Sequence, residues 1–248
     1  MAEQTLVTRE DREGVAILSL NRPQALNALS PAMFVELRDH IDRISSETES
    51  VGCVILRGEG KSFSAGNDLK AILNGDIAPS QHFQAQTLDA IEQLPQPVIA
   101  SVQGHCYTGS LELALSCDLL VASESAKFAD THGKWALTPT WGMSQRLPRR
   151  IGLLRAKEMM LTGRVVSGAQ SVTIGLANYC VADDQLAARS WQLAQDIVKN
   201  SWFTLRADKA LVLAGQQRHL QDALLHEREN SPGRGPDSAA RMAAFSKS

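Results

Sequence analysis

Glu112 is the one acid among the apolar residues 111–115 of a segment that begins with a glycine-bearing turn. The segment runs from Gly104 to Asp118 and reads GHCYTGSLELALSCD. Backbone N–H groups at the start of a helix can hold an oxyanion, and a carboxylate one turn further along would lie beside it. The same acid could instead be solvated on an amphipathic helix, as most helical glutamates are. Periodicity alone favours this second interpretation.

The composition excludes several classes of protein. The chain has 248 residues, 44% of them hydrophobic, which is enough for one large domain or a domain with an appendage. A net charge of −2 provides no basic stripe for nucleic acid, and no apolar run is long enough to span a bilayer. We expect a cytoplasmic protein, because the first residues do not resemble a signal peptide. The four cysteines form no Cys-x-x-Cys pair, which favours buried free thiols over disulfides or a metal site.

Strands and helices are predicted to alternate over the first three quarters of the chain. The expected strands are 6–10, 15–20, 51–58, 98–102, 118–122 and 177–181. The expected helices are 31–46, 79–94, 143–150, 152–161, 167–172, 184–200, 203–214, 220–229 and 237–245. This alternation indicates an α/β domain whose ligands gather at the carboxyl ends of strands. The small-residue loops around 60–70 and 104–110 both follow strands, so we expect them to converge on one ligand.

Four stretches together carry a resemblance to a known family. They are 21–30 (NRPQALNALS), 62–70 (SFSAGNDLK), 104–118, and the short motifs QRL, LTG and IGLA between 145 and 177. In this order and spacing the chain resembles the enoyl-CoA hydratase/isomerase (crotonase) family along nearly its whole length. The resemblance implies a crotonase-like α/β spiral of ββα turns over residues 1–195. It also implies a C-terminal helical oligomerisation region over 196–248 and assembly as a homotrimer or a hexamer, a dimer of trimers.

The resemblance also implies a ligand, an acyl-CoA thioester, with no cofactor apart from the coenzyme A of the substrate. By position, the N–H groups of Asn67 and Gly109 would form an oxyanion hole around the thioester carbonyl. The backbone of Ala65 would meet the adenine. Lys70 could bind charged groups of the nucleotide or simply be a surface lysine. Lys209 is in a region where the family often supplies nucleotide contacts, although an ordinary surface lysine is the default interpretation.

The sequence departs from the family at the second catalytic acid. Glu112 falls on the first glutamate of the family's hydratases, and the second should follow twenty positions later, where this chain has His132. Imidazole can also perform acid–base chemistry near neutral pH, so His132 is either catalytic or a hydrogen-bonded structural histidine. Its neighbours Asp130 and Lys134 could contribute to this chemistry, although loop structure or surface charge is the favoured interpretation. Trp135 and Trp141 would shape an apolar acyl pocket or pack in the core.

The leading hypothesis is therefore a lyase of fatty acid metabolism, an enoyl-CoA hydratase that adds water to a 2-enoyl-CoA. Glu112 would be the base, and His132 would be a secondary acid or base. One alternative is an isomerase that shifts the double bond with Glu112 alone. Another is a non-catalytic acyl-CoA-binding protein. The sequence leaves the length and identity of the acyl chain open.

Overall fold

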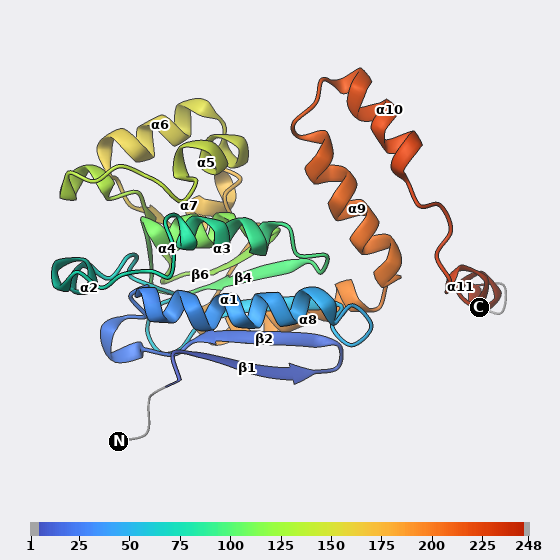
Figure 1. Ribbon diagram of the computed structural model, residues 1–248, viewed down its shortest axis with the longest axis horizontal. Helices are drawn as coiled ribbons and strands as arrows, with labels where there is room; N and C mark the ends of the chain where they lie inside the picture. Colours follow the sequence, from blue (N-terminus) through green and yellow to red (C-terminus); the bar gives the residue numbers. More distant parts are fainter. Residues whose placement is uncertain (1–4, 246–248) are drawn as a thin grey trace.

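The main sheet of the computed structural model, which describes residues 5–245, has six strands (Figure 1). Their order is β1 (Val7–Arg12), β2 (Val15–Leu20), β3 (Cys53–Gly58), β4 (Val98–Val102), β6 (Leu119–Ser123) and β9 (Tyr179–Val181). The first two strands form an antiparallel hairpin, and all later neighbours are parallel. The sheet confirms the predicted α/β architecture and the predicted opening hairpin.

Helices account for most of the remaining chain. They are α1 (Pro31–Ser46), α2 (Leu69–Asn74), α3 (Phe83–Glu92), α4 (Gly109–Leu115), α5 (Met143–Ile151), α6 (Leu153–Thr162), α7 (Gly168–Thr173), α8 (Leu186–Val198), α9 (Trp202–Gly215), α10 (Leu220–Asn230) and α11 (Ser238–Phe245). Helix α1 has the predicted bounds because Ser30 accepts a hydrogen bond from the N–H of Met33 (3.2 Å) and Pro31 occupies the first helical position. The expected boundary between residues 195 and 196 lies within α8.

The inner strands β3 and β4 of the main sheet are buried on both faces, which explains their continuous apolar runs. In β3, Val54 and Leu56 belong to the larger core cluster, together with side chains of α1 and α4. The alternate residues, Cys53 and Ile55, belong to a second cluster with Leu186 of α8. A strand with helices on both sides needs apolar side chains at every position, because successive residues point to opposite faces.

A second, smaller sheet lies beside the first and was not predicted from the sequence. It contains β5 (His105–Tyr107), β7 (Lys127–Ala129) and β8 (Val166–Ser167). Strands β5 and β7 are parallel, and their carboxyl ends lead directly into α4 and into residues 130–132. The small sheet therefore places the segment that carries Glu112 next to the segment that carries His132.

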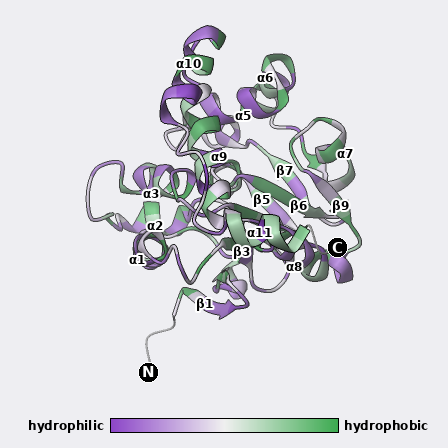
Figure 2. Ribbon diagram, turned by 90° about the vertical axis from the view of Figure 1, so that its right-hand side faces the viewer, coloured by the Kyte–Doolittle hydropathy of each residue, from purple (hydrophilic) through white to green (hydrophobic). Residues whose placement is uncertain are grey.

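The last three helices extend away from the two sheets (Figure 1). None of the residues of α9, α10 or α11 is buried, and Figure 2 shows that α11 is largely hydrophobic. Large apolar side chains are consequently exposed along this part of the chain: Val212, Leu220, Leu225, Met242 and Phe245. Among residues 5–245, no helix combines the length and the hydropathy needed to cross a membrane.

Candidate active site

The loops that follow β3 and β5 lie side by side, as the sequence predicted. The N–H of Ser64 donates to the carbonyl of His105 (2.9 Å), and the hydroxyl of Ser110 donates to the carbonyl of Ser64 (2.8 Å). The loops touch at Gly66, where an added β-carbon would lie 2.5 Å from the carbonyl oxygen of Tyr107. With a φ of 102°, Gly66 also adopts a backbone conformation that favours glycine.

Two backbone N–H groups at this junction have no hydrogen-bond acceptor within residues 5–245. On either side of Asn67, the carbonyl of Gly66 accepts from the N–H of Leu29, and the N–H of Asp68 donates to the carbonyl of Leu29. The N–H of Asn67 itself donates to no atom of residues 5–245. Gly109 is the first residue of α4, where a helix has no internal acceptor for its N–H. A β-carbon added to Gly66 would lie 3.8 Å from the backbone nitrogen of Gly109, so the two loops are close together here. Both N–H groups are thus free to bind an oxygen atom of a ligand.

Thr108 ties the start of α4 to the segment that follows β7. Its φ of 52° is unusual for a residue other than glycine and costs about 1–3 kcal/mol. Three hydrogen bonds hold it there: its N–H donates to the carbonyl of Ala129 (2.8 Å), and its hydroxyl bonds to both the hydroxyl and the N–H of Thr131. The positions of residues 109–112 and 130–132 are therefore coupled.

Glu112 is buried, with one carboxylate oxygen occupied and the other available. Oε1 accepts hydrogen bonds from the N–H groups of Trp141 (3.0 Å) and Met143 (2.9 Å). Oε2 lies 3.9 Å from Nε2 of His132. Burial raises the pKa of Glu112, and the two N–H groups and the His132 charge only partly oppose this rise. A carboxylate with a raised pKa and one free oxygen is suited to accept a proton.

His132 is held by a carboxylate on the side of its ring away from Glu112. Its Nδ1 lies 2.7 Å from Oδ1 of Asp130, and its backbone N–H donates to the same oxygen (3.0 Å). Burial lowers the pKa of His132, but the hydrogen bond and charge of Asp130, with the charge of Glu112, outweigh burial and raise it. The structure thus brings Glu112 and His132 together.

Asp130 has a contact with the ring of His132 that the sequence analysis did not predict. It is only 2% exposed and hydrogen-bonded to His132, so the interpretation as surface charge was wrong for this residue, whereas its place in the loop after β7 agrees with the other interpretation. Lys134 is exposed, in agreement with its interpretation as surface charge. The spacing Asp-x-His was a usable signal, because an aspartate side chain commonly bonds to the backbone N–H two residues later.

The remaining candidates lie at varied distances from this centre. Ala65 is half-buried, and its N–H donates to the carbonyl of Leu26 (2.9 Å). Lys70, in the first turn of α2, has an exposed side chain. Trp141 is buried and packs edge-on against Phe34, with ring centroids 5.0 Å apart, whereas Trp135 is 58% exposed. Of the two tryptophans, only Trp141 belongs to the core.

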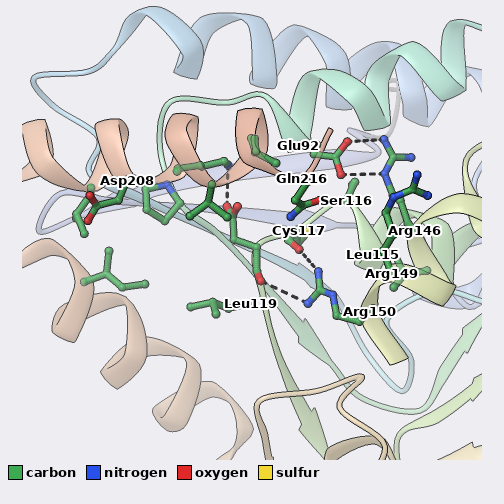
Figure 3. Close-up of a pocket in the computed structure, with 17 residues that line it drawn as sticks. Glu92, Leu115, Ser116, Cys117, Leu119, Arg146, Arg149, Arg150, Asp208 and Gln216 are labelled. Carbon is green, nitrogen blue, oxygen red and sulfur yellow. Dashed lines mark hydrogen bonds and ion pairs between the residues drawn. The ribbon is translucent and has the colours of Figure 1, made fainter. Parts of the chain in front are cut away.

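Lys209 is not a surface lysine. Its Nζ donates to Oδ2 of Asp118 (2.7 Å) and to the carbonyl of Gln96 (3.0 Å), and its side chain is 7% exposed. The pair lines a cavity of about 820 Å³ between α9 and the core, which also contains the Arg146–Glu92 ion pair (Figure 3). Neither Glu112 nor His132 lines this cavity. The Lys209–Asp118 ion pair therefore joins α9 to the core outside the candidate site.

Comparison with known proteins agrees with this fold. The family model for enoyl-CoA hydratase/isomerase matches residues 10–233. The chain belongs to the enoyl-CoA hydratase/isomerase family and has its crotonase fold.

Two curated relatives and one solved structure illustrate the similarity. A probable peroxisomal enoyl-CoA hydratase of Arabidopsis thaliana is 33% identical over 93% of this chain and 87% of its own length. A putative enoyl-CoA hydratase/isomerase of Bacillus subtilis is 37% identical over 92% and 89%, respectively. The crystal structure of an enoyl-CoA hydratase from Bacillus anthracis superposes with a TM-score of 0.92, at 33% identity, covering 98% of this chain and 96% of that one.

Proposed function

We propose that this protein is an enoyl-CoA hydratase in which Glu112 and His132 form the acid–base pair. The observation that carries the proposal is the 3.9 Å approach of Nε2 of His132 to Oε2 of Glu112, near two N–H groups that have no acceptor in the described part of the chain. Hydration needs three things: a base for water, a proton donor for C2 and stabilisation of the charge on the thioester oxygen. The free oxygen of Glu112, the ring of His132 and the N–H groups of Asn67 and Gly109 match these needs.

In the proposed reaction, Oε2 of Glu112 takes a proton from water as the water oxygen attacks C3. The electron pair of the double bond moves to the thioester oxygen, forming an enolate that the N–H groups of Asn67 and Gly109 stabilise. The protonated Nε2 of His132 then donates its proton to C2. Proton transfer from Glu112 back to His132 restores both groups, so the net change is the addition of one water molecule.

The coenzyme A portion of the substrate would lie beside the first loop. We assign the adenine to the backbone of Ala65 and a phosphate to Lys70, whose exposed ammonium is free to reach it. No cofactor beyond this coenzyme A enters the proposal. We further propose that the protein acts in the cytoplasm.

The proposed assembly is a homotrimer or a pair of trimers. Helices α9–α11 bury no residue within the single chain, yet they carry large apolar side chains such as Val212 and Leu220. Exposed apolar surface on this scale is typical of protein–protein contacts. Light scattering of the purified protein measures the state directly, and a monomeric mass would contradict the proposed assembly.

The test of the function is hydration of 2-enoyl-CoA substrates of several chain lengths. The wild-type protein should consume the absorbance of the conjugated thioester. Glu112→Gln should lower kcat by about 10²–10⁴-fold, since the amide can still accept the two backbone hydrogen bonds but cannot accept a proton from water. Retained acyl-CoA binding without consumption at any chain length would contradict the proposal and favour a non-catalytic binding protein.

The isomerase alternative needs only one shuttling base, and Oε2 of Glu112 alone could move a proton between C2 and C4. A monofunctional enoyl-CoA isomerase from M. smegmatis has a related structure, with a TM-score of 0.78 and 33% identity. A 3-enoyl-CoA distinguishes the two reactions: an isomerase converts it to the conjugated thioester, whereas a hydratase without isomerase activity leaves it unchanged.

A further inference from the structure

Asp130 makes two contacts with the same residue through one oxygen atom. Oδ1 lies 2.7 Å from Nδ1 of His132 and accepts the backbone N–H of His132 at 3.0 Å. The carboxylate is buried, which is costly for a charged group unless it is hydrogen-bonded. Among residues 5–245, the side chain that contacts this buried acid belongs to a candidate acid–base residue, and that partner explains its position better than the loop does.

The contact determines which ring nitrogen faces Glu112. A carboxylate accepts hydrogen bonds, so Nδ1 must carry the hydrogen, and Nε2 then points toward Oε2 of Glu112 at 3.9 Å. The ring cannot turn over without losing the contact with Asp130. Thr131, between the two residues, is bonded to Thr108 at the start of α4, which carries Glu112. The whole arrangement is therefore fixed relative to Glu112.

The charges around the ring favour its protonated form. Two carboxylates, Asp130 and Glu112, face His132 from opposite sides. Lys134, on the same turn, is exposed, and its side chain lies near Gly163. An imidazolium between two buried carboxylates is stabilised by both.

We propose that Asp130 is a positioning residue that holds His132 as a proton donor directed at the substrate side of Glu112. The inference rests on the proposed function for its consequence in catalysis. The hydrogen bond between Asp130 and the ring of His132 can be tested without any substrate. Asp130 and His132 together would then take the place of the second carboxylate of the family's hydratases.

The first experiment is a pH titration of histidine ring nitrogens by NMR on uniformly ¹⁵N-labelled protein. The His132→Gln variant identifies the resonances of His132. In the wild type we expect the neutral form of His132 to carry its hydrogen on Nδ1. In Asp130→Asn, which retains the shape of the side chain but not its charge, the pKa of His132 should move downward, and Asp130→Ala should also release the fixed tautomer.

The control is Asp184→Asn, which removes an exposed acid elsewhere and should leave the titration of His132 unchanged. A His132 titration that is the same in Asp130→Asn as in the wild type would overturn the inference, whatever the catalytic activity. If the wild type hydrates no enoyl-CoA, the proposed function fails, but this titration still decides the role of Asp130.

The second experiment is a double-mutant cycle in the hydration assay. Asp130→Asn should lower kcat by on the order of 10²-fold with little change in KM, because it affects the proton donor and not substrate binding. If Asp130 acts through His132, the double variant Asp130→Asn/His132→Gln should be no slower than His132→Gln alone. Independent, multiplying losses would show that Asp130 does not act through His132 and would overturn the inference.

Discussion

The indole ring of Trp141 lies directly against the backbone of Gly109. A β-carbon added to Gly109 would lie 2.4 Å from Cζ3 of the ring, closer than any real contact allows. The backbone of Trp141 also donates to Oε1 of Glu112 (3.0 Å). The same residue thus packs against one proposed oxyanion donor and orients the proposed base, so displacement of its ring would disturb both.

Gly109→Ala tests this relationship. The new methyl group must displace the indole, and overpacking of this kind costs about 1–3 kcal/mol. We also expect kcat for hydration to fall by about 10²-fold or more, as when an oxyanion donor is lost. Unfolding in urea and initial rates measure the two effects. Gly215→Ala is the control, because its nearest neighbour lies 3.9 Å away and alanine is favoured in a helix. Wild-type stability and rate in Gly109→Ala would contradict the importance of this contact.

Asp68 stabilises the other loop in a pH-dependent manner. It accepts the N–H groups of Lys70 (3.0 Å) and Ala71 (3.2 Å) at the start of α2 and forms an ion pair with Arg22. Burial alone would raise the pKa of Asp68, but Arg22 and the N–H groups lower it below its usual value. Because the pKa is lower in the folded state, this stability is present above about pH 4 and is lost as the pH falls through the folded pKa.

Asp68→Ala should therefore reduce the free energy of unfolding at pH 7 by about 1–2 kcal/mol. The difference from the wild type should shrink as the pH falls below about 4, where Asp68 becomes protonated in the unfolded chain, and should vanish below the lowered pKa of the folded protein. Urea unfolding at several pH values measures this. Asp68→Asn keeps an oxygen that can cap α2 but removes the charge that pairs with Arg22, so it measures the contribution of the ion pair apart from that of the helix cap. A difference between Asp68→Ala and the wild type that is equally large at all pH values would exclude the ionic contribution.

The sequence predicted most of the fold because the spacing of hydrophobic residues indicates where the longer helices and strands lie. The run Val98–Val102 became β4 with the same bounds, and the capped, amphipathic segment from Pro31 to Ser46 became α1. The second sheet was missed for a physical reason. Strands β5 and β7 have only three residues each, too few for a periodic pattern, and pairing between distant segments creates them.

The sequence predicted part of the candidate site. The convergence of the two loops followed from their places after strands. The resemblance to the family singled out His132, because it stands twenty positions after Glu112. The partnership of His132 with Asp130 did not follow, since burial of a loop aspartate depends on what packs over it. Nor could the sequence show that Lys209 forms a partly buried ion pair with Asp118, 91 residues away.

The Lys209–Asp118 pair should hold α9 against the core. Removing the ammonium with Lys209→Met leaves the Asp118 carboxylate without its partner, apart from the N–H of Val98 (2.7 Å). We expect a loss of about 2–3 kcal/mol, below the usual figure for a buried pair, because the Asp118 side chain is 26% exposed. Hydrogen exchange in residues 202–215 should accelerate. Lys199→Met, which removes an exposed pair with Asp196, should have little effect. Equal exchange in the two variants would exclude an anchoring role.

Restoring a carboxylate at position 132 should fail unless Asp130 is changed as well. In His132→Glu, the new carboxylate would face Asp130 and Glu112, which hold the imidazole from opposite sides in the wild type. Like charges at such distances repel by a few kcal/mol at most, and burial strengthens the effect. The single variant should therefore be less stable than the wild type and hydrate 2-enoyl-CoA more slowly at pH 7. Adding Asp130→Asn should recover stability and at least about 10-fold in rate. A His132→Glu protein as active as the wild type, with no gain from Asp130→Asn, would show that Asp130 imposes no requirement on its neighbour.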